Sequence, residues 1–222
     1  MHTLREVVLV AGRRNSLLPS ELWRAPLRTV RPQDLAGIYA QPRPEVARLV
    51  GQGVLHRVAH GYYIIVPPDF VGRTWLPGLE AAAAGISSSI YGPDQAIVMG
   101  ISAARMLGAV PRALATAVIA VPNQHRPIAL TDRSAQVRFV RRDTDTLDAE
   151  RVETPLGPAL VTTPEQTVLD LARRPELGNA EAEVRSAIAT LYRGSDLSRL
   201  TQLAADQRLG AALRRVEGWV GA

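Results

Sequence analysis

The sequence predicts a two-domain α/β protein, with a small N-terminal domain over residues 1–70 and a mixed α/β domain over residues 71–222 that ends in a helical tail. Three observations lead to this prediction. The first third combines short helical stripes with a β-rich hairpin pattern. Proline and glycine then interrupt the chain between Pro67 and Gly78, and apolar β-rich runs afterwards alternate with helical stripes.

The N-terminal domain is expected to contain three short helices and one hairpin. Thr3 and Glu6 have the spacing of a capping box at the start of the first helix. Pro32 suits the first turn of the second helix, because a proline there loses no hydrogen bond. The order of helix, tight break, helix and hairpin predicts a winged helix-turn-helix. The expected helices lie at residues 3–11, 32–39 and 44–50, and the expected strands at 54–58 and 62–67.

The second domain is predicted from apolar patterns of three kinds. Uninterrupted β-rich runs indicate buried strands, an alternating run indicates a half-exposed strand, and stripes with a period of 3.6 residues indicate helices. Strands are expected at residues 115–121, 136–142 and 159–161, and helices at 79–90, 101–107, from 164 onward, and near 180–193, 196–207 and 210–220.

Two residue types are missing, and their absence excludes several kinds of chemistry. All 26 basic side chains counted as lysine or arginine are arginine. Without lysine there is no Walker A loop, no kinase ATP site, no pyridoxal Schiff base and no Ser-x-x-Lys catalytic pair. Without cysteine there is no disulfide, thiol nucleophile, cysteine zinc site or iron–sulfur cluster.

The charge is unevenly distributed and favours a polyanionic partner. The net charge is +5, and residues 1–70 hold nine arginines against five acids. The apolar run near the N-terminus is short and contains an acid, which is not typical of a signal peptide, and no run of 18 apolar residues occurs. We therefore expect a cytoplasmic, nucleoid-associated protein with no membrane partner.

The predicted winged helix-turn-helix carries polar side chains suited to double-stranded DNA. Arginine can pair with guanine and glutamine with adenine, while exposed cations contact phosphates. The alternative is a winged helix that docks proteins and has solvated arginines. The DNA-binding candidates are Gln41, Arg43, Arg48 and Gln52 beside the apolar stripe of the third helix, Arg57 and His60 in the wing, and Arg13 and Arg14 as backbone clamps.

Other patterns have structural explanations, and we expect no catalytic residue, metal site or cofactor. Ser102 lies in a sequence one glycine short of a nucleophile elbow, so we expect it to be a helix N-cap. Thr163 is expected to cap the helix that begins at Pro164, with Gln166 reaching back to it. The four histidines do not have the spacing of a zinc motif; they are His2, His56, His60 and His125.

Two charged clusters leave alternatives open. The acids could belong to a metal-dependent nuclease, although solvated loop acids are the simpler interpretation and the lysine of the common nuclease core is missing. The arginines could form a solvated strand face, further phosphate contacts or a surface for an acidic partner. The acids are Asp143, Asp145, Asp148, Glu150 and Glu153, and the arginines are Arg126, Arg133, Arg138, Arg141 and Arg142.

Four stretches, in this order, resemble the AbiEi-type antitoxins, which are transcriptional regulators of type IV toxin–antitoxin pairs. The resemblance spans roughly residues 35–175, and one departure is Gln166, where the family usually has arginine. The stretches are the helix-to-wing passage at 49–63, the Ser-Ala helix at 100–108, the strand at 117–122 and the segment at 163–172.

This resemblance implies a repressor that binds inverted repeats in its own promoter. It also implies an antitoxin that counters a cognate nucleotidyltransferase toxin, not necessarily through a stable complex, and it implies no enzymatic activity. The alternatives are a winged-helix regulator whose second domain senses a ligand, and the nuclease.

Overall fold

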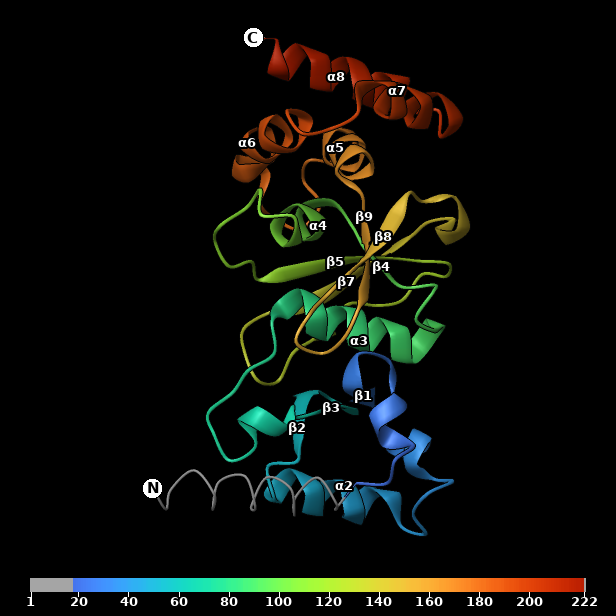
Figure 1. Cartoon of the computed structure of the whole chain (residues 1–222), viewed down its shortest axis with the longest axis vertical. Helices are drawn as coiled ribbons and strands as arrows, with labels where there is room; N and C mark the ends of the chain where they lie inside the picture. The colour runs from blue at the N-terminus through green and yellow to red at the C-terminus, as the bar shows by residue number, and fades with distance from the viewer. Residues whose placement is uncertain (1–17, 222) are drawn as a thin grey trace.

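The structure, a computed structural model, describes residues 18–221. The molecule is elongated, with an N-terminal unit at one end, a six-stranded sheet in the middle and helices at the other end (Figure 1). The described residues form two sheets and seven α-helices, so the mixed α/β class is confirmed. Within residues 18–221 no helix combines the length and the apolar character needed to cross a membrane.

The N-terminal sheet consists of β1 (Thr29–Val30), β2 (Leu55–Ala59) and β3 (Tyr62–Ile65), all antiparallel and in the order β1-β3-β2. β2 and β3 form the predicted hairpin. Their turn contains Gly61, whose φ of +80° lies in the left-handed region that favours glycine. β1 is only two residues long, which is too short to give a periodic signal in the sequence.

The helix before the hairpin is α2 (Pro42–Gly51), which confirms the helix predicted at 44–50 and begins two residues earlier. Val46 and Leu49 are buried under the sheet, as the apolar stripe predicts. The helix predicted at 32–39 is wrong: only Pro32–Leu35 is helical, as a single 3-10 turn. So short a segment forms too few hydrogen bonds to offset the cost of nucleating an α-helix. The helix predicted at 3–11 lies outside the described residues.

The central sheet is mixed, with the strand order β6-β7-β5-β4-β9-β8. The three strands predicted for this domain are confirmed as β5, β7 and β9, while β4 lies between β5 and β9 and β6 and β8 form the two edges. β5 is buried at every position, as its uninterrupted apolar run predicts. The strands are β4 (Ile97–Val98), β5 (Thr116–Val121), β6 (Ile128–Ala129), β7 (Gln136–Arg141), β8 (Ala149–Val152) and β9 (Ala159–Thr162).

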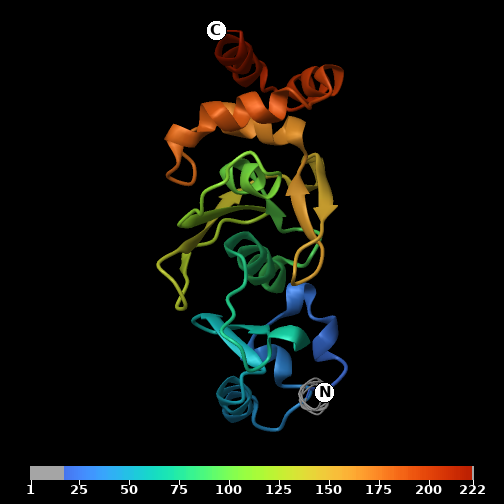
Figure 2. The same cartoon turned by 60° about the vertical axis from the view of Figure 1, so that its left-hand side comes forward.

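All six helices predicted for this domain are present. The first lies between the central sheet and the N-terminal unit, and the others lie on the opposite side of the sheet, with the last two farthest from it (Figures 1 and 2). They are α3 (Leu79–Tyr91), α4 (Gly100–Met106), α5 (Pro164–Arg173), α6 (Glu181–Tyr192), α7 (Leu197–Asp206) and α8 (Gly210–Val220).

Ser102 is not the N-cap of α4, so that prediction is wrong; the cap position is Met99. Ser102 is fully buried, and its Oγ accepts a hydrogen bond of 2.9 Å from the backbone N–H of Val118. β4 ends at Val98, so Ser102 supplies the acceptor that Val118 lacks beyond the end of that strand. The hydroxyl therefore completes the sheet and is not exposed for chemistry.

Thr163 caps α5 as predicted, because its hydroxyl accepts a hydrogen bond from the N–H of Gln166. The side chain of Gln166 does not reach back to the cap, which corrects the predicted capping box. It is fully buried, and its amide exchanges reciprocal hydrogen bonds with the amide of Gln207. Gln166 thus connects α5 to the segment between α7 and α8.

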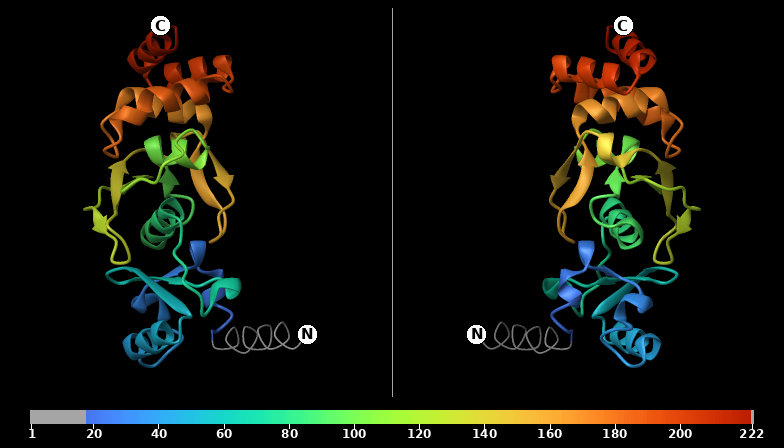
Figure 3. Two further views of the ribbon diagram at one scale, coloured as in Figure 1. Left: turned by 90° about the vertical axis from the view of Figure 1, so that its left-hand side faces the viewer. Right: turned by 90° about the vertical axis from the view of Figure 1, so that its right-hand side faces the viewer.

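The two units are packed closely at two places. Gly85 of α3 lies directly against Thr29 and Leu27 of the N-terminal unit. The hairpin also lies beside the loop between β6 and β7 (Figures 2 and 3), where the N–H of Thr131 donates a 2.9 Å hydrogen bond to the carbonyl of Val58. The expected domain division at residue 70 falls in the segment between β3 and α3 and remains a prediction.

Candidate nucleic-acid interface

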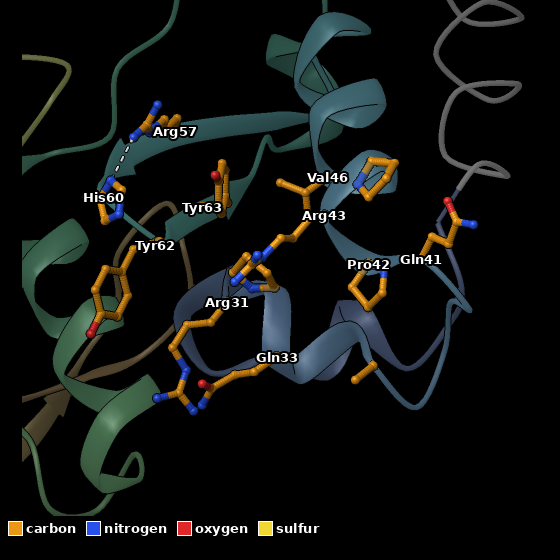
Figure 4. Close-up of a pocket in the computed structure, with 14 residues that line it drawn as sticks. Arg31, Gln33, Gln41, Pro42, Arg43, Val46, Arg57, His60, Tyr62 and Tyr63 are labelled. Carbon is orange, nitrogen blue, oxygen red and sulfur yellow. Dashed lines mark hydrogen bonds between the residues drawn. The ribbon is translucent and has the colours of Figure 1, made fainter.

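A groove of about 950 Å³ lies between the start of α2, the 3-10 turn at Pro32–Leu35 and the hairpin (Figure 4). We call it the hairpin groove. Its side chains are mostly polar or basic, with two tyrosines and several prolines. The labelled lining residues are Arg31, Gln33, Gln41, Pro42, Arg43, Val46, Arg57, His60, Tyr62 and Tyr63.

Four of the predicted DNA-binding residues lie together in this groove. Gln41 and Arg43 come from the start of α2, and Arg57 and His60 come from the hairpin. All four are exposed. The guanidinium of Arg57 lies 3.1 Å from Nδ1 of His60, so the imidazole nitrogen can accept its hydrogen bond. Residues about 15 positions apart in the sequence thus form one polar surface.

Arg48 and Gln52 lie farther along α2, outside the hairpin groove. Both are exposed, as expected for positions beside the apolar stripe. The Nε of Arg48 donates a 2.9 Å hydrogen bond to the carboxylate of Glu45, and its Nη1 donates a 2.8 Å hydrogen bond to the side-chain oxygen of Gln52. The hydrogen bond from Arg48 is the main reason why the pKa of Glu45 is lowered. Contact with an outside phosphate would therefore compete with Glu45.

The structure adds Arg31 and the two tyrosines, which sequence reasoning missed. Arg31 directly follows β1, and its guanidinium forms an ion pair with Asp34 at 3.0 Å. Burial raises the pKa of Tyr62, so its hydroxyl stays protonated and can donate. Because β1 is so short, no pattern in the sequence indicated that Arg31 faces the hairpin. Arg13 and Arg14 lie outside the described residues.

His56, the other histidine of the hairpin, joins the two units. Nε2 of His56 lies 2.7 Å from Oδ2 of Asp132, which follows β6. Arg133 also binds this carboxylate, at 3.0 Å. Burial acts to raise the pKa of Asp132, but the hydrogen bonds from Arg133 and His56 outweigh it and lower the pKa below its usual value. This cluster fixes the base of the hairpin against the central sheet.

Three of the five acids predicted as a cluster at residues 143–153 have structural partners, while Glu150 and Glu153 are exposed. Asp143 accepts a hydrogen bond from the N–H of Asp145, whose own carboxylate accepts one from Gln95. Asp148 accepts from Arg199 at 2.6 Å and from the hydroxyl of Thr163 at 2.7 Å. In the part of the chain that the structure describes, no three histidine or acidic side chains are grouped to hold a metal ion.

The arginines predicted as one cluster do not form a single surface. Arg133 is paired with Asp132, as described above. Arg142 lies at the end of β7 and donates a 2.8 Å hydrogen bond to Asp170, whose side chain is completely buried. Burial raises the pKa of Asp170, while the charge of Arg142 acts in the opposite direction. Arg141 is exposed and lines a small cavity together with Arg142.

Comparison with known proteins identifies the central sheet and the helices around it. A family model described as the AbiEi antitoxin C-terminal domain matches residues 96–217, which is more than half of the chain. The chain belongs to the AbiEi antitoxin family. The match to the antitoxin domain begins just before β4 and ends within α8, so the hairpin groove lies outside it.

The fold of this AbiEi protein also resembles a solved structure. The crystal structure of the RV2827C protein from Mycobacterium tuberculosis has a TM-score of 0.55 and is 20% identical in sequence. The alignment covers 96% of this chain and 81% of that chain, so it includes both units. At this identity the likeness concerns the fold alone. Among curated proteins, none matches the sequence.

Proposed function

We propose that this chain is a DNA-binding transcriptional repressor and the antitoxin of a toxin–antitoxin operon. In this proposal residues 1–70 form a winged helix-turn-helix that binds inverted repeats in the operon's own promoter, and residues 71–222 form the antitoxin domain. Membership of the AbiEi antitoxin family supports the antitoxin role. The observation that supports DNA binding is the hairpin groove, which gathers Gln41, Arg43, Arg57 and His60.

The groove suits a sugar–phosphate backbone. Arg43 and Arg57 lie on opposite walls, one on α2 and the other on the hairpin, and both are exposed. When a phosphate enters between them, the two arginines replace the counterions condensed on the DNA, and the release of these ions supplies most of the sequence-independent affinity. Gln41, Tyr63 and His60 add hydrogen-bonding groups to the same walls. These contacts would position the protein on the duplex.

In this proposal the exposed face of α2 recognises the DNA bases. Arg48 in α2 and Gln52 at its C-cap are exposed, whereas Val46 and Leu49 of the same helix are buried. A helix of this width fits the major groove of B-DNA, where arginine can pair with guanine and glutamine with adenine. On binding DNA, the guanidinium of Arg48 would leave the carboxylate of Glu45 and form hydrogen bonds with the edge of a base. Glu45 thereby weakens non-specific binding, because it competes with every phosphate.

Arg43→Ala and Arg57→Ala are each expected to weaken binding to the promoter DNA. If each side chain contacts one phosphate, the slope of log K against log salt should flatten by about one unit, with all DNA sequences affected alike. Fluorescence anisotropy with the DNA upstream of the chain's own gene, at several salt concentrations, measures this. Arg24→Ala is the matched control, since Arg24 is also exposed in the N-terminal unit but does not line the groove.

If Arg24→Ala and Arg43→Ala lost DNA affinity equally, the result would contradict the groove as the DNA interface. Absence of any binding by the unaltered protein at low salt would contradict the repressor function altogether.

The antitoxin role is expected to survive loss of DNA binding. We propose that the partner is a nucleotidyltransferase toxin, countered without need of a stable complex. Full-length protein with both Arg43→Ala and Arg57→Ala should still rescue cells that express the neighbouring toxin gene, although it no longer represses the promoter. A growth assay combined with a promoter reporter measures both effects. If the unaltered protein failed to rescue these cells, the result would instead favour a transcriptional regulator without antitoxin activity.

A further inference from the structure

A small cavity of about 90 Å³ lies on the antitoxin domain, far from the hairpin groove in sequence and in fold. It is enclosed by the end of β7, the residue after β4 and the C-terminal end of α5. Four arginines and one acid line it, and the rest of the lining is apolar. The charged residues are Arg141, Arg142, Arg173, Arg174 and Asp170.

The arginines at this cavity are only partly neutralised. Arg142 is paired with Asp170, and Arg174 donates a 3.1 Å hydrogen bond to the exposed Glu176. Arg141 and Arg173 are exposed, and no hydrogen bond from either guanidinium to another described residue is present. Two guanidinium groups without partners therefore flank the opening, and they are suited to a ligand that carries several acceptor oxygens.

The buried acid holds a third arginine in place at this cavity. Oδ1 of Asp170 binds Arg142 at 2.8 Å and the amide of Gln166 at 3.3 Å. The side chain of Asp170 is 0% exposed, so a ligand in the cavity meets the arginines and not the carboxylate. Four arginines thus line the cavity with a single acid, and this excess of positive charge favours an anion.

We propose that this cavity binds one phosphate group, either as inorganic phosphate or as a phosphate monoester. The oxygens of one phosphate can accept charge-assisted hydrogen bonds from Arg141 and Arg173 at the same time. The volume is equivalent to about three water molecules, which suits a single tetrahedral oxyanion. A neighbouring hollow of about 380 Å³, which shares Arg141 and Arg142, has space for the organic part of an ester.

Isothermal titration of the full-length protein tests the proposal, in a buffer free of phosphate and at constant ionic strength. The probes are inorganic phosphate, glycerol phosphate, acetate and chloride. Saturable binding of one phosphate probe per chain is expected, with acetate and chloride much weaker. Tighter binding of glycerol phosphate than of inorganic phosphate identifies a monoester as the ligand, and the reverse identifies the free anion.

Arg141→Gln and Arg173→Gln should each weaken phosphate binding by about tenfold, the effect of losing one charge-assisted contact. Arg193→Gln is the matched control, because Arg193 is exposed but lines neither hollow. Three outcomes would overturn the proposal. They are no saturable phosphate binding, acetate binding as tight as phosphate binding, or a loss of phosphate affinity in Arg193→Gln as large as in the other two variants. DNA binding through the hairpin groove is independent of all three.

Discussion

Replacement of Arg142 by methionine is expected to lower the free energy of unfolding by about 3–5 kcal/mol, the usual result when one partner of a buried ion pair is removed. The side chain of Arg142 is 16% exposed and that of Asp170 is 0% exposed, so water cannot take over the role of the guanidinium. Arg142 also donates to Gln207 at 3.3 Å. The substitution therefore leaves the buried carboxyl group with the amide of Gln166 as its one remaining side-chain donor among the described residues, and it removes one donor from Gln207.

The cost of this substitution should depend on pH. Without Arg142, only Gln166 and Arg173 still oppose the burial that raises the pKa of Asp170, so the folded protein retains a proton that the unfolded chain releases. Stability then falls as pH rises above the unfolded value of about 3.9. Urea unfolding of Arg142→Met should show a larger loss at pH 8 than at pH 5.

Two further variants separate this explanation from a simple packing defect. Asp170→Asn in the Arg142→Met background should abolish the extra pH dependence, because the titrating group is gone. Arg141→Met is the matched control, and its effect should stay within about 0.5 kcal/mol because Arg141 is exposed. Equal stability loss in the Arg141 and Arg142 variants, or no change with pH, would contradict the role assigned to this ion pair.

Most of the antitoxin domain could be predicted because its elements carry local signals. The uninterrupted apolar run of β5 and the proline after Thr163 each indicate an element without reference to the rest of the chain. The interactions of Arg142 could not be predicted in this way. Its partners Asp170 in α5 and Gln207 after α7 lie 28 and 65 residues away in the sequence, and only the fold of the whole domain brings them to the end of β7.

The hairpin groove was predictable to a similar extent. The hairpin and α2 follow from alternation, glycine and proline, so Arg43 and Arg57 could be chosen as exposed cations on one unit. The pairing of Arg48 with Glu45 depends on rotamers that residue spacing alone does not determine. Likewise, the 3-10 turn at Pro32–Leu35 replaced an expected helix because its amphipathic pattern covers too few residues to select one helical type.

Replacement of Gly85 by leucine is expected to destabilise the protein by about 3 kcal/mol, near the upper end of overpacking effects. A Cβ at position 85 would overlap the hydroxyl of Thr29 and lie 3.2 Å from the Cβ of Thr29 and 3.4 Å from that of Leu27. The N-terminal chain cannot easily move away. Leu27 and Arg28 already have φ angles of +46° and +53°, and the hydroxyl of Thr29 is bonded to the carbonyl of Leu27 at 3.1 Å.

Gly218→Leu is the matched control for this prediction. Gly218 is also within a helix, but a Cβ there meets nothing within 4 Å, so leucine should be neutral or stabilise α8 by up to about 1 kcal/mol. A double-mutant cycle with Gly85→Ala and Thr29→Ala tests the contact itself. Removal of the Thr29 hydroxyl should recover part of the loss caused by Gly85→Ala, whereas purely additive effects would show that the close approach of α3 to β1 does not limit the size of residue 85.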